Sequence, residues 1–101
     1  MGIEVELRGE DGEVLEEVTN SRTALSRAAR GALSGTRLLK YLTPRGDAIL
    51  NQAQADDLAH DIRDLVSAHP GTPLADVLAD VQRLAERLSA ETHLYLWFVG
   101  D

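Results

Sequence analysis

Apolar and charged residues alternate at the start of the chain. Ile3, Val5 and Leu7 alternate with charged side chains, the turn residues of Gly9–Gly12 follow, and Val14–Val18 resumes as an extended segment. A period of two is typical of a strand with one buried face, and Asp-Gly is a common hairpin loop. The pattern therefore predicts an N-terminal β-hairpin.

The last apolar run, His93–Val99, does not alternate in this way. Both of its faces are apolar, with Leu94, Leu96 and Phe98 on one and Tyr95, Trp97 and Val99 on the other. A strand that is apolar on both faces is usually central in its sheet or buried on both sides. We therefore expect a C-terminal strand in the interior of the sheet.

Two stretches between these strands have helical periodicity. Asn51 and Gln54 resemble a capping box before the first, and Thr72 and Pro73 occupy the N-cap and first helical positions of the second. The apolar stripes are Leu58, Ile62, Leu65 and Val66, then Leu74, Val77, Leu78, Val81, Leu84, Ala85 and Leu88. The short Pro-Gly-Thr-Pro connection between them predicts an antiparallel helical hairpin.

The segment from residue 20 to residue 46 allows two interpretations. A helix begins near Arg22, and it either continues to Lys40 or stops at Ser34-Gly35-Thr36. If it stops there, Thr36–Leu42 becomes a third strand.

Together these elements predict one α+β domain over residues 1–101. Its sheet is small and mostly antiparallel, has three to four strands including the N-terminal hairpin and the C-terminal strand, and is covered on one face by two to three helices. The 44% of hydrophobic residues suffice for an ordinary core, and the lack of cysteine excludes disulfides and cysteine catalysis. The longest apolar run has six residues and no signal peptide is visible, so we expect a cytoplasmic protein without a membrane span.

Charge is segregated along the chain. Residues 20–46 contain six basic residues and no carboxylate, whereas the rest holds all 17 acids and four bases, within a net charge of -7. Such a segment either pairs with acidic neighbours inside the fold or binds an anionic partner. The strongly acidic remainder and the lack of stacking aromatics near the bases argue against nucleic acid. Nine arginines against one lysine suggest a GC-rich, bacterial-like coding sequence.

Candidate chemistry is sparse. One polar helical face carries Asp56, Asp57, His60, Asp61 and Asp64. We interpret this face as solvated, because two ligands from one helix do not make a metal site. No nucleophile elbow or P-loop order is present. We predict no catalytic residue, no metal and no cofactor.

These observations predict a small acidic protein-protein interaction or regulatory module, in the manner of antitoxin and immunity proteins by analogy only. The partner is another protein, a second copy of the chain through an uncovered sheet face, or both. The candidate partner-binding residues are Arg22, Arg27, Arg30, Arg37, Lys40, Tyr95 and Trp97. The alternative is a small-ligand or anion-binding domain, or a minor enzyme, in which Arg30, Arg37, Ser34 and Thr36 bind the ligand and His60 or Asp57 assists.

Overall fold

The computed structural model describes residues 2–18 and 21–100, without the side chain of Arg22. Its strands form one antiparallel sheet in the order β2-β1-β4-β3, with β1 Ile3–Gly9, β2 Val14–Val18, β3 Ala48–Leu50 and β4 Leu94–Gly100. Its helices are α1 Ser21–Ala28, α2 Ala55–Ala68 and α3 Pro73–Ala90, with short 3-10 turns at Leu39–Tyr41 and Gln52–Gln54. The predicted α+β fold is confirmed.

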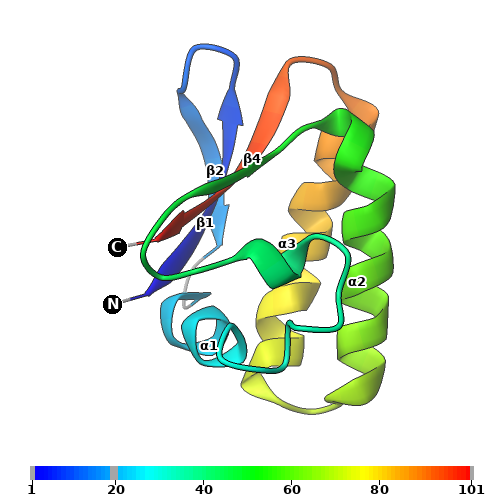
Figure 1. The fold of residues 1–101 in the computed structure, drawn as a ribbon. Coiled ribbons are helices and arrows are strands. Elements are labelled where there is room, and N and C mark those ends of the chain that lie inside the picture. Colours follow the sequence, from blue (N-terminus) through cyan, green and yellow to red (C-terminus); the bar gives the residue numbers. More distant parts are fainter. Residues whose placement is uncertain (1, 19–20, 101) are drawn as a thin grey trace.

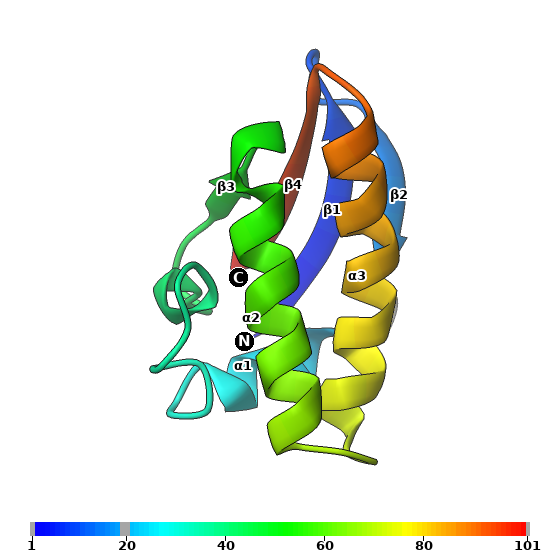
Figure 2. The ribbon, with the colours of Figure 1, turned by 90° about the vertical axis from the view of Figure 1, so that its right-hand side faces the viewer.

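The helices cover one face of the sheet (Figures 1 and 2). The helical hairpin α2–α3 packs along this face, and α1 lies near the end of the hairpin where α3 begins. The fully buried side chains come from both layers and include Ile3, Val5, Leu7, Leu25, Leu58, Leu78, Leu84, Leu88, Leu96 and Phe98. No helix in the described part of the chain is long and apolar enough to cross a membrane.

The N-terminal hairpin turns through a glycine in the left-handed region. Gly12 has a φ of 88°, and its N–H donates to the carbonyl of Gly9 at 3.0 Å. The Asp11 carboxylate accepts the N–H of Glu13 at 3.0 Å, a local bond typical of aspartate in turns. The expected hairpin is therefore present, with its turn at the expected residues.

β4 is central, as its two apolar faces predict. It pairs with β1 along its whole length, from Ile3 opposite Gly100 to Gly9 opposite Leu94, and with β3 on its other side. β3 pairs only with Leu96, Trp97 and Phe98, so one edge of β4 is paired along its whole length and the other at its middle.

The helical hairpin begins and turns at the predicted residues. The side-chain oxygen of Gln54 accepts the N–H of Asn51 at 2.9 Å, and a 3-10 turn leads from there into α2. The hydroxyl of Thr72 accepts the N–H of Ala75 at 3.2 Å at the start of α3. Both caps supply partners for N–H groups that a helix leaves unpaired at its first turn.

The segment after α1 differs from both sequence interpretations. The helix ends at Ala28, well before Ser34 and Lys40, and residues 31–38 form turns and bends. Thr36–Leu42 is neither helix nor strand, because it contains bends and the 3-10 turn Leu39–Tyr41. Its apolar side chains do not follow a period, yet Leu33, Leu39 and Leu42 are buried in the core.

The fourth strand lies later in the chain than either alternative predicted. β3 pairs Ala48 with Phe98, Ile49 with Trp97 and Leu50 with Leu96. A strand of three residues is too short to show a period of two, so the sequence indicates only a connection here.

Candidate functional site

The face of the sheet opposite the helices is the first candidate surface. In the described residues no helix covers it (Figures 1 and 2). Tyr95 and Trp97 of β4 lie on this face and are half-buried, while Leu94, Leu96 and Phe98 point into the core. Ile49 lies opposite Trp97 on β3 and is 47% exposed. We call Ile49, Tyr95 and Trp97 the apolar strip of the open face.

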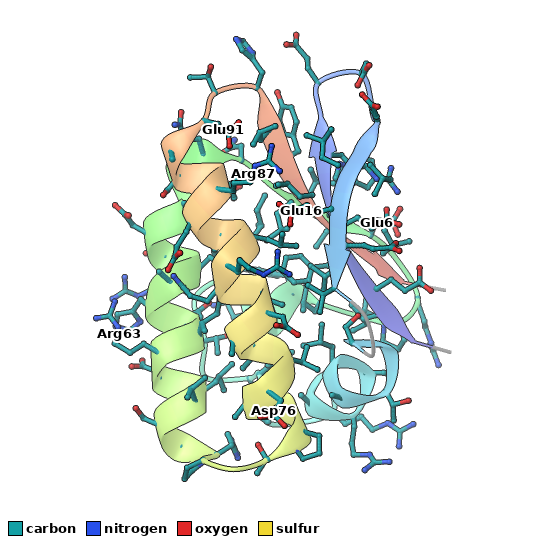
Figure 3. The ribbon with its side chains drawn as sticks, turned by 180° about the vertical axis from the view of Figure 1, so that it is seen from behind. Glu6, Glu16, Arg63, Asp76, Arg87 and Glu91 are labelled. Carbon is teal, nitrogen blue, oxygen red and sulfur yellow. The ribbon has the colours of Figure 1, made fainter. Side chains whose placement is uncertain are left out.

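Charged side chains of β1 lie directly beside the apolar strip. The register places Glu6 opposite Trp97 and Arg8 opposite Tyr95, and Figure 3 shows Glu6 on the side of the sheet away from the helices. The Arg8 guanidinium lies 4.1 Å from the centroid of the Trp97 ring, and its Nε donates to Glu6 at 2.9 Å. This stack orients Trp97 and uses the charge of Arg8, so the guanidinium is already paired within the protein.

The apolar strip ends in a depression beside the hairpin turn. It has a volume of about 260 Å³ and is lined by Gly9, Glu10, Gly12, Ile49, Tyr95 and Trp97. Its apolar wall is formed by Ile49 and the two aromatic residues, and Glu10 of the hairpin turn adds a carboxylate to its lining. Asp11 and Glu13 are exposed in the same turn. An apolar floor with an acidic rim suits a ligand that is both apolar and positively charged.

The predicted basic residues do not form one surface. Arg37 is paired within the fold, since its Nη1 donates to Asp57 of α2 at 2.8 Å. Lys40 is exposed, and its Nζ lies 5.2 Å from the centroid of the Tyr41 ring. The side chain of Arg22 lies outside the described residues. Tyr95 and Trp97 share the open face, and none of these basic residues is among the described residues that line the depression there.

Arg27 and Arg30 do lie together, on the outer side of α1. They line a hollow of about 190 Å³ with Thr23 and Ser26. Within the described residues neither guanidinium has an ion-pair or hydrogen-bond partner. These two cations are therefore available to an anionic ligand.

Asp61 was predicted to be part of a solvated acidic face, and that prediction is wrong. Asp61 is 1% exposed, and its two carboxylate oxygens accept the backbone N–H groups of Arg37 and Leu38 at 2.8 Å and of Leu39 at 3.2 Å. A single carboxylate thus holds the aperiodic loop after α1 against α2. Its spacing from Leu58 and Leu65 places it on the buried stripe of α2, which is the signal that identifies it in the sequence.

A cluster of ion pairs absent from the sequence interpretation joins the sheet to α3. Glu16 accepts Nη1 of Arg83 at 2.6 Å and Nη1 of Arg87 at 2.8 Å, and Arg87 also binds Glu91. Figure 3 shows Glu16 and Arg87 facing each other between β2 and α3. The bond from Arg87 is the largest effect and lowers the pKa of Glu16; desolvation opposes it, and the bond from Arg83 and the charges of both arginines lower the pKa further.

The residues of the alternative anion site do not converge. The Thr36 hydroxyl donates to the carbonyl of Leu33 at 2.6 Å, and Arg37 is bound to Asp57. Nδ1 of His60 lies 3.4 Å from the Asp64 carboxylate. In the described part of the chain, no group of three or more His, Cys, Asp or Glu residues is placed to hold a metal ion.

Comparisons of the chain with protein-family models, with curated proteins and with solved structures found no match.

Proposed function

We propose that this chain is a small acidic interaction module that binds a partner protein through the open face of its sheet. The observation that carries the proposal is the apolar strip of Ile49, Tyr95 and Trp97 on a face that no described helix covers. Aromatic residues are enriched in protein interfaces because they bury large areas with few rotatable bonds. Only four of the chain's 101 residues are aromatic, so two of them on one uncovered face is a marked concentration.

Charge selects the kind of partner. The exposed carboxylate of Glu10 lines the depression and lies 3.0 Å from Nδ1 of His93, Glu13 is exposed in the adjoining turn, and Glu17 lies on β2, two strands from Trp97. The chain as a whole carries a net charge of -7. Arg8 on the same face is already paired with Glu6 and stacked on Trp97. A partner segment that combines Lys or Arg with an apolar side chain complements this surface. A second copy of the chain would bring the same acidic rim into contact, which costs free energy through like-charge repulsion.

A selection of random peptides displayed on phage, against the purified protein, tests the proposal. We expect the enriched peptides to combine basic and apolar residues, and their binding to weaken as salt is raised. Enrichment of acidic peptides, or of no peptide, would contradict the proposed partner chemistry.

Sedimentation velocity distinguishes a foreign partner from a second copy. We expect the wild-type protein to sediment as a monomer. If it instead forms a dimer that Ile49→Lys dissociates, the open face is a self-association surface and the proposal of a basic partner is overturned.

A further inference from the structure

A groove at the opposite end of the molecule from the hairpin turn lies between α1 and the beginning of α3. Its volume is about 260 Å³, and its lining comprises Ala24, Arg27, Ala28, Ala32, His69, Thr72, Pro73 and Leu74. Most of these side chains are apolar, and Ala28 is buried while Ala24 and Leu74 are half-buried. The groove therefore offers an apolar floor between two helices.

The polar side chains left without a partner in this groove are nitrogen bases and include no carboxylate. The Thr72 hydroxyl is already engaged, since it donates to the carbonyl of His69 at 2.7 Å and accepts the N–H of Ala75. The side chains of Arg27 and His69 have no hydrogen bond or ion pair to any other described residue. No carboxylate belongs to the described lining, although the chain has 17 of them. What remains for a ligand is a guanidinium and an imidazole.

Arg27 also borders the polar hollow that it shares with Thr23, Ser26 and Arg30. The apolar groove and the polar hollow thus adjoin at one guanidinium. An anionic group bound at Arg27 would also be attracted by the positive charge of Arg30. The rest of the same molecule could extend over the alanine side chains of the groove.

We propose that this groove binds a small free carboxylic acid with an apolar body. A carboxylate matches the planar fork of Arg27 and gives charge-assisted hydrogen bonds, while the body is removed from water against Ala24, Ala28 and Leu74. The volume is slightly below the roughly 300 to 1,000 Å³ of typical ligand pockets, which selects a molecule smaller than a drug-sized ligand. The site is on a different surface from the apolar strip, so it is independent of the proposed partner binding.

Titration with 3-phenylpropanoate, followed by amide chemical shifts of the full chain, tests the site. We expect saturable shifts at Ala24, Ala28 and Leu74, and at least about tenfold weaker binding of the uncharged 3-phenylpropanamide. Arg27→Gln should weaken binding of the acid by a similar factor. The matched control is Arg63→Gln, because Arg63 is exposed on α2 and points away from the core (Figure 3), and it should leave the affinity unchanged.

Three results would overturn the proposal. The first is the absence of a saturable shift, and the second is equal affinity for the acid and the amide. The third is shifts centred on Tyr95 and Trp97, which would assign the acid to the open face. Both arginines are exposed, so thermal melting of the two variants should match wild type and exclude misfolding as the cause of lost binding.

Discussion

The buried carboxylate of Asp61 accepts the backbone N–H of Leu38 at 2.8 Å, across 23 residues of sequence. It also accepts the N–H groups of Arg37 and Leu39. Removing the carboxylate leaves these donors without partners, at a cost of about 1–3 kcal/mol in the free energy of unfolding. We therefore expect Asp61→Ala to lower the midpoint of urea unfolding substantially.

The control for Asp61 is Asp64, which follows it by three residues on the same helix and whose side chain is 66% exposed. Asp64→Ala should change the free energy of unfolding by less than about 0.5 kcal/mol. Equal losses for the two variants would show that the carboxylate of Asp61 does not support the loop.

Gly100 tests the contact between β4 and the turn before β3. A Cβ at this position would lie 2.4 Å from the carbonyl oxygen of Gly46 and 2.6 Å from that of Thr43. Because both are backbone atoms, Gly100→Ala must displace the turn, and we expect a loss of about 1–3 kcal/mol in thermal or urea unfolding.

Gly31→Ala is the matched control for Gly100→Ala. A Cβ at Gly31 has no atom within 4 Å, and its φ is not in the left-handed region. The substitution should be neutral or stabilise the protein by about 0.4–1 kcal/mol, since alanine reduces the conformational entropy of the unfolded chain. A Gly100→Ala variant as stable as Gly31→Ala would disprove the close approach.

The Glu16 ion pairs predict a pH dependence of stability. The bonds from Arg87 and Arg83 lower the pKa of Glu16 in the folded state. The stabilisation is therefore complete above the pKa of an unfolded glutamate, about 4.3, and is lost as the pH falls through the lower folded value. We expect Glu16→Gln to be less stable than wild type at neutral pH and the difference to shrink below about pH 4. A difference that is constant from neutral to acidic pH in urea unfolding would argue against these ion pairs.

The two faces of the sheet should respond differently to truncation. Leu96 is fully buried in the central strand, and Leu96→Ala should cost about 2–5 kcal/mol. Ile49 belongs to the apolar strip and is half-exposed, so Ile49→Ala should cost less than about 1 kcal/mol. Comparable losses in urea unfolding would mean that the open face is part of the core and is not available to a partner.

The parts of the fold that could be predicted are those with a period. The alternation of Ile3, Val5 and Leu7 and the caps at Asn51 and Thr72 are local signals, and the structure confirms the hairpin and the two helices that they predict. The loop after α1 has no such signal, because its conformation depends on a carboxylate more than 20 residues away in the sequence.

Of the candidate site too, only part could be predicted from the sequence. That Tyr95 and Trp97 share one face of β4 follows from their parity in the strand, but parity alone does not decide whether this face or that of Leu94, Leu96 and Phe98 is the uncovered one. The dispersal of the basic residues could not be predicted, since it depends on where α1 ends and on the pairing of Arg37 with Asp57 across 20 residues. Segregated charge in the sequence therefore does not reveal which of the arginines lie together, whereas the structure places Arg27 and Arg30 at one hollow of α1.

The most direct test of the proposed interaction compares the affinity of a selected basic peptide for Ile49→Lys and for Ala79→Lys. Each substitution adds one positive charge at an exposed position, the first on the open face and the second on α3. The quenching or shift of Trp97 fluorescence reports binding at the strip, because Trp97 is the single tryptophan of the chain. The account predicts at least about tenfold weaker binding to Ile49→Lys and an unchanged affinity for Ala79→Lys. Equal affinities for the two variants would contradict it.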